Sequence, residues 1–460
     1  MDAQQASAPR CEDIAVAVDV AHLATVLGGT NVAGLRRLLG GASRETWAFE
    51  LDGRRLVLRR DPLGSPRSGQ MDRESALLRL ARAAGVPATE VLASGPDWLV
   101  MAFVEGETLA RRILRDDAYA AARGNLVGQC ARALARLHRD IDPGAVPGLP
   151  AEDPLVGLRR TLDEVGEPHP ALELGLSWLR RQRPVECGQV VVHGDFRLGN
   201  LMVGSTGLVA VLDWELAHRG DPLEDLGWLC VRSWRFGAAL PVAGVGERAE
   251  LLDAYAAAGG VRADLDELHW WEVAGTLRWA TLCLLQARAH LEQGVRSVEL
   301  AAIGRRVCEV ELDLLDLLSD LRDCAPPPVP AEITLPHDRP TAGELLEAVR
   351  EFLDGLELTG QERYLARVSS RALGVVERQL ALGPGLAVEH AQRLAGLGVA
   401  DDEELATGIR TGRFSSEQIM QEVRASVVAK LHVADPGQLR DRPPPGARSV
   451  EPAAEGQALR

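Results

Sequence analysis

Three side chains that carry oxygen atoms lie within one short stretch of the sequence, residues 190–228. Asp195 follows an apolar run at 190–192, Asn200 comes shortly after it, and Asp213 follows the next apolar segment. A carboxylate can orient and deprotonate a hydroxyl group, and Mg²⁺ takes oxygen ligands from side chains and phosphates. Phosphoryl transfer uses this combination, because its barrier falls through positioning and through neutralisation of charge on the transferred group. The stretch therefore predicts a magnesium-dependent phosphoryl-transfer site.

The elements around these residues are predicted to hold them in place. The apolar run at 190–192 is typical of a buried strand, and it leads directly into His193-Gly194-Asp195. Two further strands are expected at 201–203 and 208–212, linked by the turn-forming sequence Gly204-Ser205-Thr206-Gly207. Because this hairpin lies between Asn200 and Asp213, it would keep the loop and the second acid at a fixed distance.

The segment before these elements has the pattern of a small sheet with one helix. Strands are predicted at 34–39, 47–51 and 54–60, and Asp52-Gly53 is a two-residue hairpin turn. A loop of small residues, 40–46, separates the first two strands. A helix is predicted at 72–84, and a second hairpin at 90–94 and 98–104. Residues 1–30 form a lead-in with one helix near 19–27.

The rest of the chain is predicted to be mainly helical. Clear amphipathic helices occur at 125–138 and 171–181, and helices dominate up to residue 321. Residues 324–340 begin with Cys-Ala-Pro-Pro-Pro-Val-Pro, a proline-rich linker that marks a domain boundary. Helices resume at 341–433, starting with the capping-box sequence of Thr341 and Glu344. The tail at 434–460 is rich in Pro, Gly, Arg and Glu and is expected to be disordered.

Composition excludes several classes of protein. The formal net charge is −15, which disfavours a broad nucleic-acid surface. The seven cysteines are odd in number and form no CxxC pair, so we expect reduced thiols and a cytoplasmic protein. No uninterrupted apolar stretch is long enough for a membrane span. The most apolar helical stretch, which includes Trp270, Trp271 and Trp279, is expected to be buried in a core.

The motifs at 193–227 also resemble those of a known family. His193-Gly194-Asp195, Asn200, Asp213-Trp214-Glu215 and the segment 220–227 match the pattern of the aminoglycoside phosphotransferase family, a branch of the protein-kinase-like fold. Within it, the chain most resembles kinase-like domains fused to acyl-CoA dehydrogenases. The resemblance covers about residues 30–320. The C-terminal part resembles an uncharacterised helical domain found after such domains.

The resemblance implies an α+β, bilobal fold. The β-rich N-lobe would span 31–105 and the helical C-lobe, with the catalytic loop, 106–323; a separate all-α domain would follow. Asp225 would brace the catalytic loop, or else be an acid at a helix N-terminus, and His193 would pack and hydrogen-bond to hold that loop. His138 is interpreted as a helix C-terminal cation or a packing group.

Site residues follow from the same resemblance. Asp195 would be the catalytic base, while Asn200 and Asp213 would hold Mg²⁺. Arg197 would contact an anionic substrate or the γ-phosphate, or be a surface residue; Glu215 would contact metal or substrate, or be solvated. The nucleotide, ATP or GTP, would be bound by residues from several elements: Gly40, Gly41 and Ser43 in the small-residue loop, Arg59 with Glu74, and Met101 and Phe103 near the interlobe hinge. Arg59 stands where kinases carry lysine, and Arg is not equivalent to Lys at a phosphate.

Two classes of function remain open. In the first, the protein is a small-molecule kinase that phosphorylates a hydroxyl; the acceptor is a hydroxy acid or hydroxyacyl-thioester, or alternatively an aminoglycoside or another antibiotic. In the second, it is a catalytically silent nucleotide-binding module. In either case the C-terminal helices are candidates for oligomerisation or partner docking. No strand–GxGxxG–helix unit is present, which argues against a Rossmann domain.

Overall fold

The computed structural model describes residues 20–38, 44–61, 69–321, 328 and 340–440. Gly40, Gly41 and Ser43 lie outside the described residues, as do most of the predicted linker and the last twenty residues of the chain. The chain divides into two compact units. The first comprises residues 1–151, 187–229 and 234–264, and the second comprises 152–186, 230–233 and 265–460.

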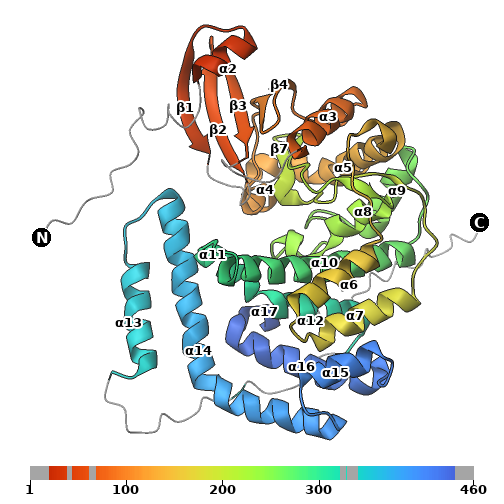
Figure 1. Ribbon diagram of the computed structural model, residues 1–460, viewed down its shortest axis with the longest axis vertical. Coiled ribbons are helices and arrows are strands. Elements are labelled where there is room, and N and C mark those ends of the chain that lie inside the picture. Colours follow the sequence, from red (N-terminus) through yellow and green to blue (C-terminus); the bar gives the residue numbers. More distant parts are fainter. Residues whose placement is uncertain (1–19, 39–43, 62–68, 322–327, 329–339, 441–460) are drawn as a thin grey trace, which may run out of the picture. The chain divides into compact units, whose positions relative to one another are not determined.

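A five-stranded antiparallel sheet opens the first unit, in the order β1-β2-β3-β5-β4 (Figure 1). The strands are β1 (Val32–Leu38), β2 (Glu45–Leu51), β3 (Arg54–Arg60), β4 (Val91–Ser94) and β5 (Trp98–Ala102). All five predicted strands are present, with ends that differ by up to two residues. Asp52 and Gly53 connect β2 to β3 with φ angles of 51° and 83°, as the predicted hairpin turn requires.

Two helices accompany this sheet. Helix α2 (Val20–Leu27) packs Leu23 into a cluster with buried sheet residues that include Trp47, Phe49 and Leu56. Helix α3 (Gln70–Ala83) buries a face that includes Leu77 and Leu78. The prediction of a small sheet with one helix after its third strand is confirmed.

The remainder of the first unit consists of helices and short strands. Its helices are α4 (Ala110–Arg115), α5 (Ala120–Asp140), α8 (Leu223–Cys230, whose last residue falls in the other unit) and α9 (Arg248–Ala257). Its strands form two antiparallel pairs, β6 (Val190–Val192) with β9 (His218–Gly220), and β7 (Leu201–Gly204) with β8 (Gly207–Val211). The predicted strand before Asp195 and the hairpin between Asn200 and Asp213 are therefore both present.

The regular elements of the second unit are helices within its described residues. Its earlier helices are α6 (Pro154–Val165), α7 (Pro170–Arg181), α10 (Leu265–Leu291), α11 (Val298–Gly304) and α12 (Val307–Leu318). Its later helices are α13 (Ala342–Asp354), α14 (Gly360–Leu397), α15 (Asp402–Arg410), α16 (Ser416–Ala434) and α17 (Gly437–Arg440). Thr341 and Glu344 form the predicted capping box at the start of α13. Trp270, Trp271 and Trp279 are buried on α10, as expected of core residues.

One hydrophobic core joins the helices on either side of the predicted linker. Helices α7 and α12 contribute Ala171, Leu174, Cys308, Leu312 and Leu315, and the chain after residue 390 contributes Leu394, Val399, Leu405, Ile409, Ile419, Met420, Val423, Val427, Val428 and Leu431. The division by contacts thus differs from the predicted boundary at 324–340. The proline-rich sequence marks a change along the chain, but apolar surfaces on both sides of it are buried together.

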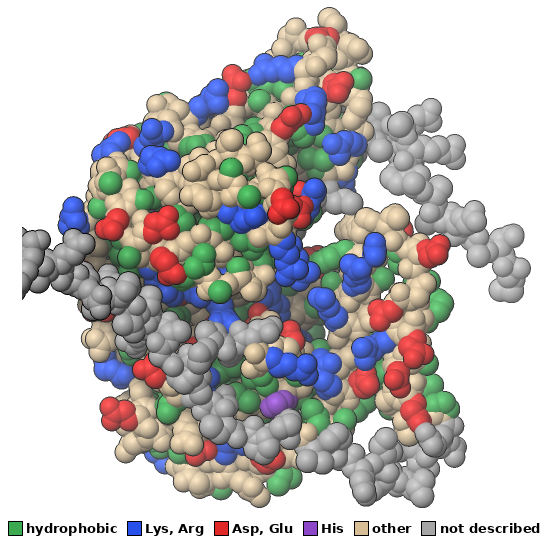
Figure 2. Space-filling model, turned by 180° about the vertical axis from the view of Figure 1, so that it is seen from behind, with side chains coloured by type: hydrophobic (Ala, Val, Ile, Leu, Met, Phe, Trp, Pro, Cys, Tyr) green, Lys and Arg blue, Asp and Glu red, His purple; other side chains and the backbone are tan. Residues whose placement is uncertain are grey.

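The surface of the described residues is mixed in charge. Figure 2 shows basic and acidic side chains interspersed over one face. Within the described ranges, no helix is both long and apolar enough to cross a membrane. Cys130, Cys283 and Cys308 are free thiols, and burial raises the pKa of each of them to about 12.

Candidate active site

Strand β6 delivers the chain into the loop that carries Asp195, and a glycine makes the turn. Gly194 has φ +77°, and a Cβ at this position would lie 2.4 Å from the backbone oxygen of Leu216. Positive φ and this close approach together require glycine. Steric constraints therefore explain why the predicted motif has glycine at position 194.

Asp225, on α8, braces this loop through its backbone N–H groups. It is 0% exposed, and it accepts hydrogen bonds from the backbone N–H groups of His193 (2.8 Å, to Oδ2) and Gly194 (2.9 Å, to Oδ1). Burial by itself would raise the pKa of Asp225, but the hydrogen bond and charge of His138 and the hydrogen bond from the His193 backbone N–H lower it below the ordinary value. The carboxylate is therefore ionised, and it fixes two consecutive peptide groups just before Asp195, as the resemblance implied.

His138 connects Asp225 to Tyr255 on helix α9. Its Nε2 lies 3.1 Å from Asp225 Oδ2, and its Nδ1 lies 2.8 Å from the hydroxyl of Tyr255 on α9. Burial, followed by the charges of Asp225 and Asp221, raises the pKa of Tyr255. His138 was expected to be a helix-end cation or a packing group; in the structure it positions the bracing carboxylate.

His193 is fully buried under the loop and held in one tautomer. The backbone N–H of Asp195 donates to its Nδ1 (3.2 Å), so Nε2 carries the proton and donates to the backbone oxygen of Leu212 (3.1 Å). Burial lowers the pKa of His193, and the nearby charges of Asp225 and Asp195 oppose this without reversing it. The ring is therefore neutral and connects the Asp195 loop to the end of β8.

Asp195 is held by three side chains. The Nε1 of Trp228 (2.9 Å) and the Nε of Arg197 (3.0 Å) donate to Oδ1, and the Nδ2 of Asn200 donates to Oδ2 (2.5 Å). Asp195 is 9% exposed. Its carboxylate is thus fixed on both oxygens and still reaches the surface.

Arg197 is itself held by an aromatic side chain. Its guanidinium carbon lies 4.7 Å from the ring centroid of Trp234, within the range of a cation–π contact. Trp234 in turn packs against Trp228, with 5.3 Å between ring centroids. The two residues that donate to Asp195 Oδ1 therefore belong to one aromatic cluster.

Asn200 and Asp213 lie at the two ends of the β7–β8 hairpin. Asn200 uses its amide nitrogen to bond both the carboxylate and the backbone oxygen of Asp195, and its backbone oxygen accepts from the N–H of Leu212 (2.8 Å). Asp213 has φ +63°, a conformation that costs a non-glycine residue of order 1–3 kcal/mol and concentrates at functional sites. The structure therefore brings Asn200 to Asp195 directly. Asp213 directly follows Leu212, whose N–H bonds the backbone of Asn200, so the chain at Asp213 lies next to Asn200.

Arg59 lies between two carboxylates. Its Nη1 donates to Glu74 Oε1 (2.5 Å) and its Nη2 to Asp213 Oδ1 (3.3 Å). Burial would lower the pKa of Arg59, but Glu74, Asp213 and Glu215 raise it above its ordinary value. The expected pairing of Arg59 with Glu74 is present, and Arg59 also contacts Asp213.

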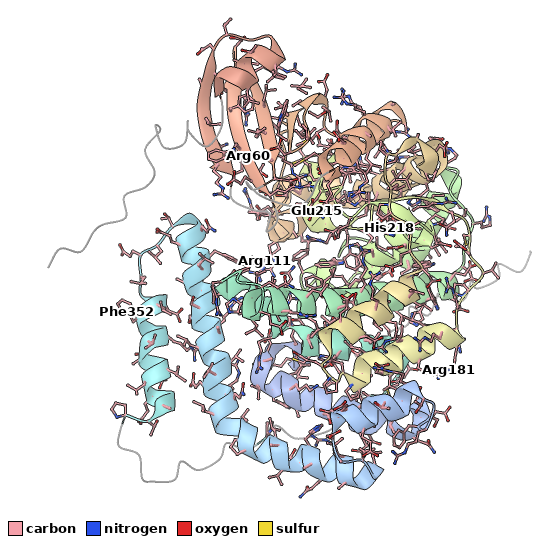
Figure 3. All side chains as sticks on the ribbon, viewed as in Figure 1. Arg60, Arg111, Arg181, Glu215, His218 and Phe352 are labelled. Carbon is pink, nitrogen blue, oxygen red and sulfur yellow. The ribbon has the colours of Figure 1, made fainter. Side chains whose placement is uncertain are left out.

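The other expected site residues lie apart from these contacts or outside the described chain. Met101 is buried in β5, where the Thr89 hydroxyl donates to its sulfur (3.2 Å), and Phe103 follows β5 with the Arg55 guanidinium 3.7 Å from its ring centroid. Glu215, labelled in Figure 3, is half-buried and acts on Arg59 by charge. Gly40, Gly41 and Ser43 fall in a range that the structure does not describe.

The side chains of Asn200 and Asp213 suit a hard divalent cation. The amide nitrogen of Asn200 donates its hydrogen bonds to Asp195. The amide oxygen is therefore the atom that Asn200 can offer to a cation. Asp213 is 35% exposed at its side chain, and its ion pair with Arg59 engages Oδ1. An amide oxygen and a carboxylate oxygen are ligands of the kind that Mg²⁺ takes alongside phosphate oxygens.

Some residues of the site were not identified from the sequence. The motif spacing does not point to Trp228 or Trp234, and Arg44 lies within the predicted loop 40–46. The signal for Trp228 is its place beside the motif, since a buried tryptophan N–H usually finds an acceptor. Arg44 had no such signal, because its partners are distant in sequence.

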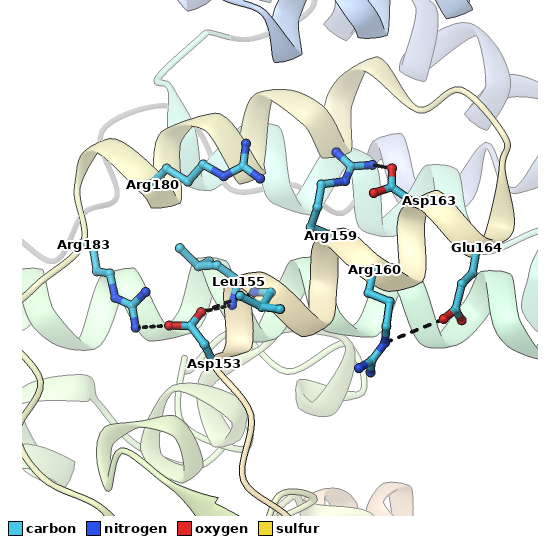
Figure 4. Close-up of a pocket in the computed structure, with 9 residues that line it drawn as sticks. Asp153, Leu155, Arg159, Arg160, Asp163, Glu164, Arg180 and Arg183 are labelled. Atoms are coloured by element: carbon cyan, nitrogen blue, oxygen red, sulfur yellow. Dashed lines mark hydrogen bonds and ion pairs between the residues drawn. The ribbon is translucent and has the colours of Figure 1, made fainter.

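A cavity of about 740 Å³ lies in the second unit, and none of the site residues above lines it (Figure 4). Four arginines line it, and three of them pair with acids: Arg183 with Asp153 (2.6 Å), Arg159 with Asp163 (2.8 Å) and Arg160 with Glu164 (3.7 Å). The positive charge of this cavity is therefore largely neutralised by its own walls.

Comparison with known proteins identifies the family. A family model described as "Phosphotransferase enzyme family" (APH) matches residues 34–271, just over half of the chain. The chain belongs to this phosphotransferase family. A second model, a domain of unknown function (DUF6285), matches residues 356–438. The resemblance stated from the motifs, including the uncharacterised C-terminal domain, is confirmed.

Individual relatives agree with this family. The chain is 29% identical over 224 residues to acyl-CoA dehydrogenase family member 10 of Mus musculus, covering 44% of this chain and 21% of that protein. It is 29% identical over 216 residues to acyl-CoA dehydrogenase family member 11 of Gallus gallus, covering 42% and 27%. The match thus spans about a quarter or less of the length of these relatives.

A solved structure supports the fold. A crystal structure from Ralstonia eutropha JMP134, named for the aminoglycoside phosphotransferases, aligns with a TM-score of 0.51 and 21% identity, covering 65% of this chain and 96% of that one. The α+β kinase-like fold, with an antiparallel sheet followed by helices, is therefore confirmed, and further long helices follow it in this phosphotransferase.

Proposed function

We propose that this phosphotransferase moves the γ-phosphate of ATP or GTP to a hydroxyl group of a small molecule, with Asp195 as the general base. The observation that carries the proposal is the Asp195 carboxylate, which three side-chain donors hold while part of it stays exposed. A fixed carboxylate can orient an incoming hydroxyl and take its proton as the oxygen attacks phosphorus. The bracing by Asp225 supports this role, because a rigid loop keeps the base in position.

Asn200 and Asp213 are the residues that we propose for Mg²⁺. A bound Mg²⁺ would neutralise charge on the phosphate oxygens. Arg59, oriented by Glu74, is proposed to add positive charge at the nucleotide phosphates, since a guanidinium can bond two phosphate oxygens at once. Gly40, Gly41 and Ser43 are proposed to approach the phosphates with backbone N–H groups, and Met101 and Phe103 to lie near the base.

Arg197 is proposed to contact the γ-phosphate or an anionic group of the acceptor. Its Nε is used by Asp195 and its face by Trp234, so its terminal nitrogens are the atoms that would make this contact. An acceptor with an anionic group agrees with the relatives named as acyl-CoA dehydrogenase family members. We therefore propose a hydroxy acid or hydroxyacyl-thioester as acceptor, with an aminoglycoside or another antibiotic as the alternative.

A screen of acceptors tests this function. Purified protein would be incubated with ATP or GTP, Mg²⁺ and a panel of hydroxyacyl-CoAs, hydroxy acids, sugars, macrolides and aminoglycosides, and nucleoside diphosphate release measured. Asp195→Asn should lower kcat by about 10²- to 10⁴-fold, the range for loss of a general base, while nucleotide affinity survives. Asp117→Asn, at an exposed position on a short helix, is the matched control and should keep full activity.

The silent-module hypothesis makes a different prediction. It expects Mg²⁺-dependent nucleotide binding without turnover on any acceptor and without slow hydrolysis of the nucleotide. Near-normal turnover by Asp195→Asn would instead refute the role given to that carboxylate. The intact set of Asp195, Asn200 and Asp213 favours the enzyme.

A further inference from the structure

A buried chain of alternating charges runs through the first unit beside the proposed nucleotide site. Glu74 accepts from two arginines, Arg59 on Oε1 and Arg44 on Oε2. At one end the Nε of Arg44 also donates to Asp61 Oδ1 (3.0 Å), and at the other end Arg59 reaches Asp213. The order of charges is therefore acid, base, acid, base, acid.

The inner part of this chain is closed to solvent. The side chains of Arg44, Asp61 and Glu74 are 1%, 4% and 2% exposed, whereas that of Arg59 is 16% exposed. These three buried side chains cannot meet a ligand directly. Arg59 and Asp213 therefore form the end of this series of charges that a phosphate can reach. Arg44 also donates from Nη2 to Gln70 Oε1 (3.2 Å), which completes its partners on three sides.

Competition for Glu74 decides how Arg59 can bind. An arginine that meets a carboxylate alone tends to engage both oxygens with two parallel N–H groups. Here Arg44 occupies Oε2, so Arg59 keeps only Oε1 and directs its other nitrogen to Asp213. Without Arg44, both oxygens of Glu74 would be available to Arg59, and its second arm would turn inward.

We propose that Arg44 is a positioning residue for nucleotide binding: by occupying one oxygen of Glu74, it keeps the second arm of Arg59 directed away from Glu74, towards Asp213 and the nucleotide phosphates. The proposal rests on the phosphotransferase function proposed above. It also accounts for arginine at position 59, because a lysine ammonium is a compact point charge and lacks the two-armed geometry that joins Glu74 to Asp213.

The test must separate positioning from folding, because Arg44→Met alone leaves Asp61 buried without its partner. Loss of one member of a buried ion pair is strongly destabilising, whereas replacing both members by apolar groups is often neutral. The informative variant is therefore Arg44→Met with Asp61→Leu. Arg36→Met, at an exposed arginine of β1 in the same sheet, is the matched control.

Melting temperature, the Kd of Mg²⁺–ATP by calorimetry, and kcat and KM would be measured for each full-length protein. We expect Arg44→Met to melt earlier and the double variant to melt near the wild type. The double variant should still bind nucleotide about 10- to 100-fold more weakly, as for loss of one charge-assisted hydrogen bond, with KM for nucleotide raised more than kcat is lowered. Arg36→Met should match the wild type in each measurement.

Two outcomes would overturn the inference or its foundation, and they are distinguishable. A stable double variant with wild-type nucleotide affinity would show that Arg44 serves folding alone. A wild-type protein that binds no nucleotide would instead refute the proposed function itself. If the double variant does not fold, Arg44→Gln with Asp61→Asn replaces it, and the same affinity comparison decides.

Discussion

The neutral, buried state of His193 predicts a specific dependence of stability on pH. The ring accepts from the Asp195 amide at Nδ1 and donates to Leu212 at Nε2, and burial lowers its pKa. An unfolded chain, by contrast, protonates this histidine at its ordinary pKa of about 6.5. Below that pH the unfolded state binds the extra proton, so the free energy of unfolding falls as the pH falls.

The size of the effect follows from linkage. The contribution of His193 is fully present above about pH 6.5 and is lost as the pH falls from there towards the folded pKa. The loss approaches about 1.4 kcal/mol per pH unit, or about 2 kcal/mol between pH 7 and pH 5 if the ring stays neutral throughout. That is a large fraction of a domain stability of about 5–15 kcal/mol.

The assay is urea unfolding of the wild type and of His193→Asn between pH 5 and pH 8. Both proteins share every other titrating group, so the difference between their pH profiles isolates His193. We expect the wild type to lose about 2 kcal/mol more than the variant between pH 7 and pH 5, and ¹⁵N NMR to show a proton on Nε2 alone. Parallel pH profiles, or a charged ring at pH 6, would refute the assignment of a neutral histidine.

Other perturbations test separate parts of the structure. Asp225→Asn places an amide against the donating N–H groups of His193 and Gly194, so we expect a loss of about 3–5 kcal/mol in urea unfolding and a sharp fall in kcat; unchanged stability would contradict the bracing role. Gly194→Ala should nearly abolish turnover, because its methyl would meet the Leu216 carbonyl, and full activity would show that the loop tolerates a different turn. Arg59→Lys should weaken nucleotide binding in calorimetry, and wild-type affinity would argue that one point charge suffices. Ending the chain at residue 323 would expose buried side chains such as Leu312, each worth about 1.5–3 kcal/mol on full burial; a monomeric, cooperatively unfolding product would show that the C-terminal helices are dispensable.

The shared core of the second unit bears on the role of the C-terminal helices. Residues matched by the domain of unknown function bury apolar side chains against α7 and α12, which precede the proline-rich sequence. Deletion of this region therefore removes part of a core, and a change in activity after deletion would not by itself indicate regulation. Point substitutions on exposed faces are the better way to test oligomerisation or docking.

Much of the fold was predictable because its signals are local. The Asp52-Gly53 turn, the alternating strands and the capping box at Thr341 depend on residues close together in sequence, and each appears as predicted. The order His193-Gly194-Asp195, Asn200, Asp213 likewise identified the phosphotransferase family from its spacing. Spacing along the sequence predicts a site well when the functional residues lie on one loop and one hairpin.

Tertiary structure decided what the partners of those residues are. The sequence indicated that Asp195 belongs to a site, but only folding brings Trp228 to its carboxylate and Trp234 to Arg197. The same holds for Arg44 and Arg59, which share Glu74 although the three residues come from a loop, a strand and a helix. Hydrogen bonds and ion pairs require contact within a few ångströms, and contact between residues far apart in the chain is fixed by packing and not by spacing.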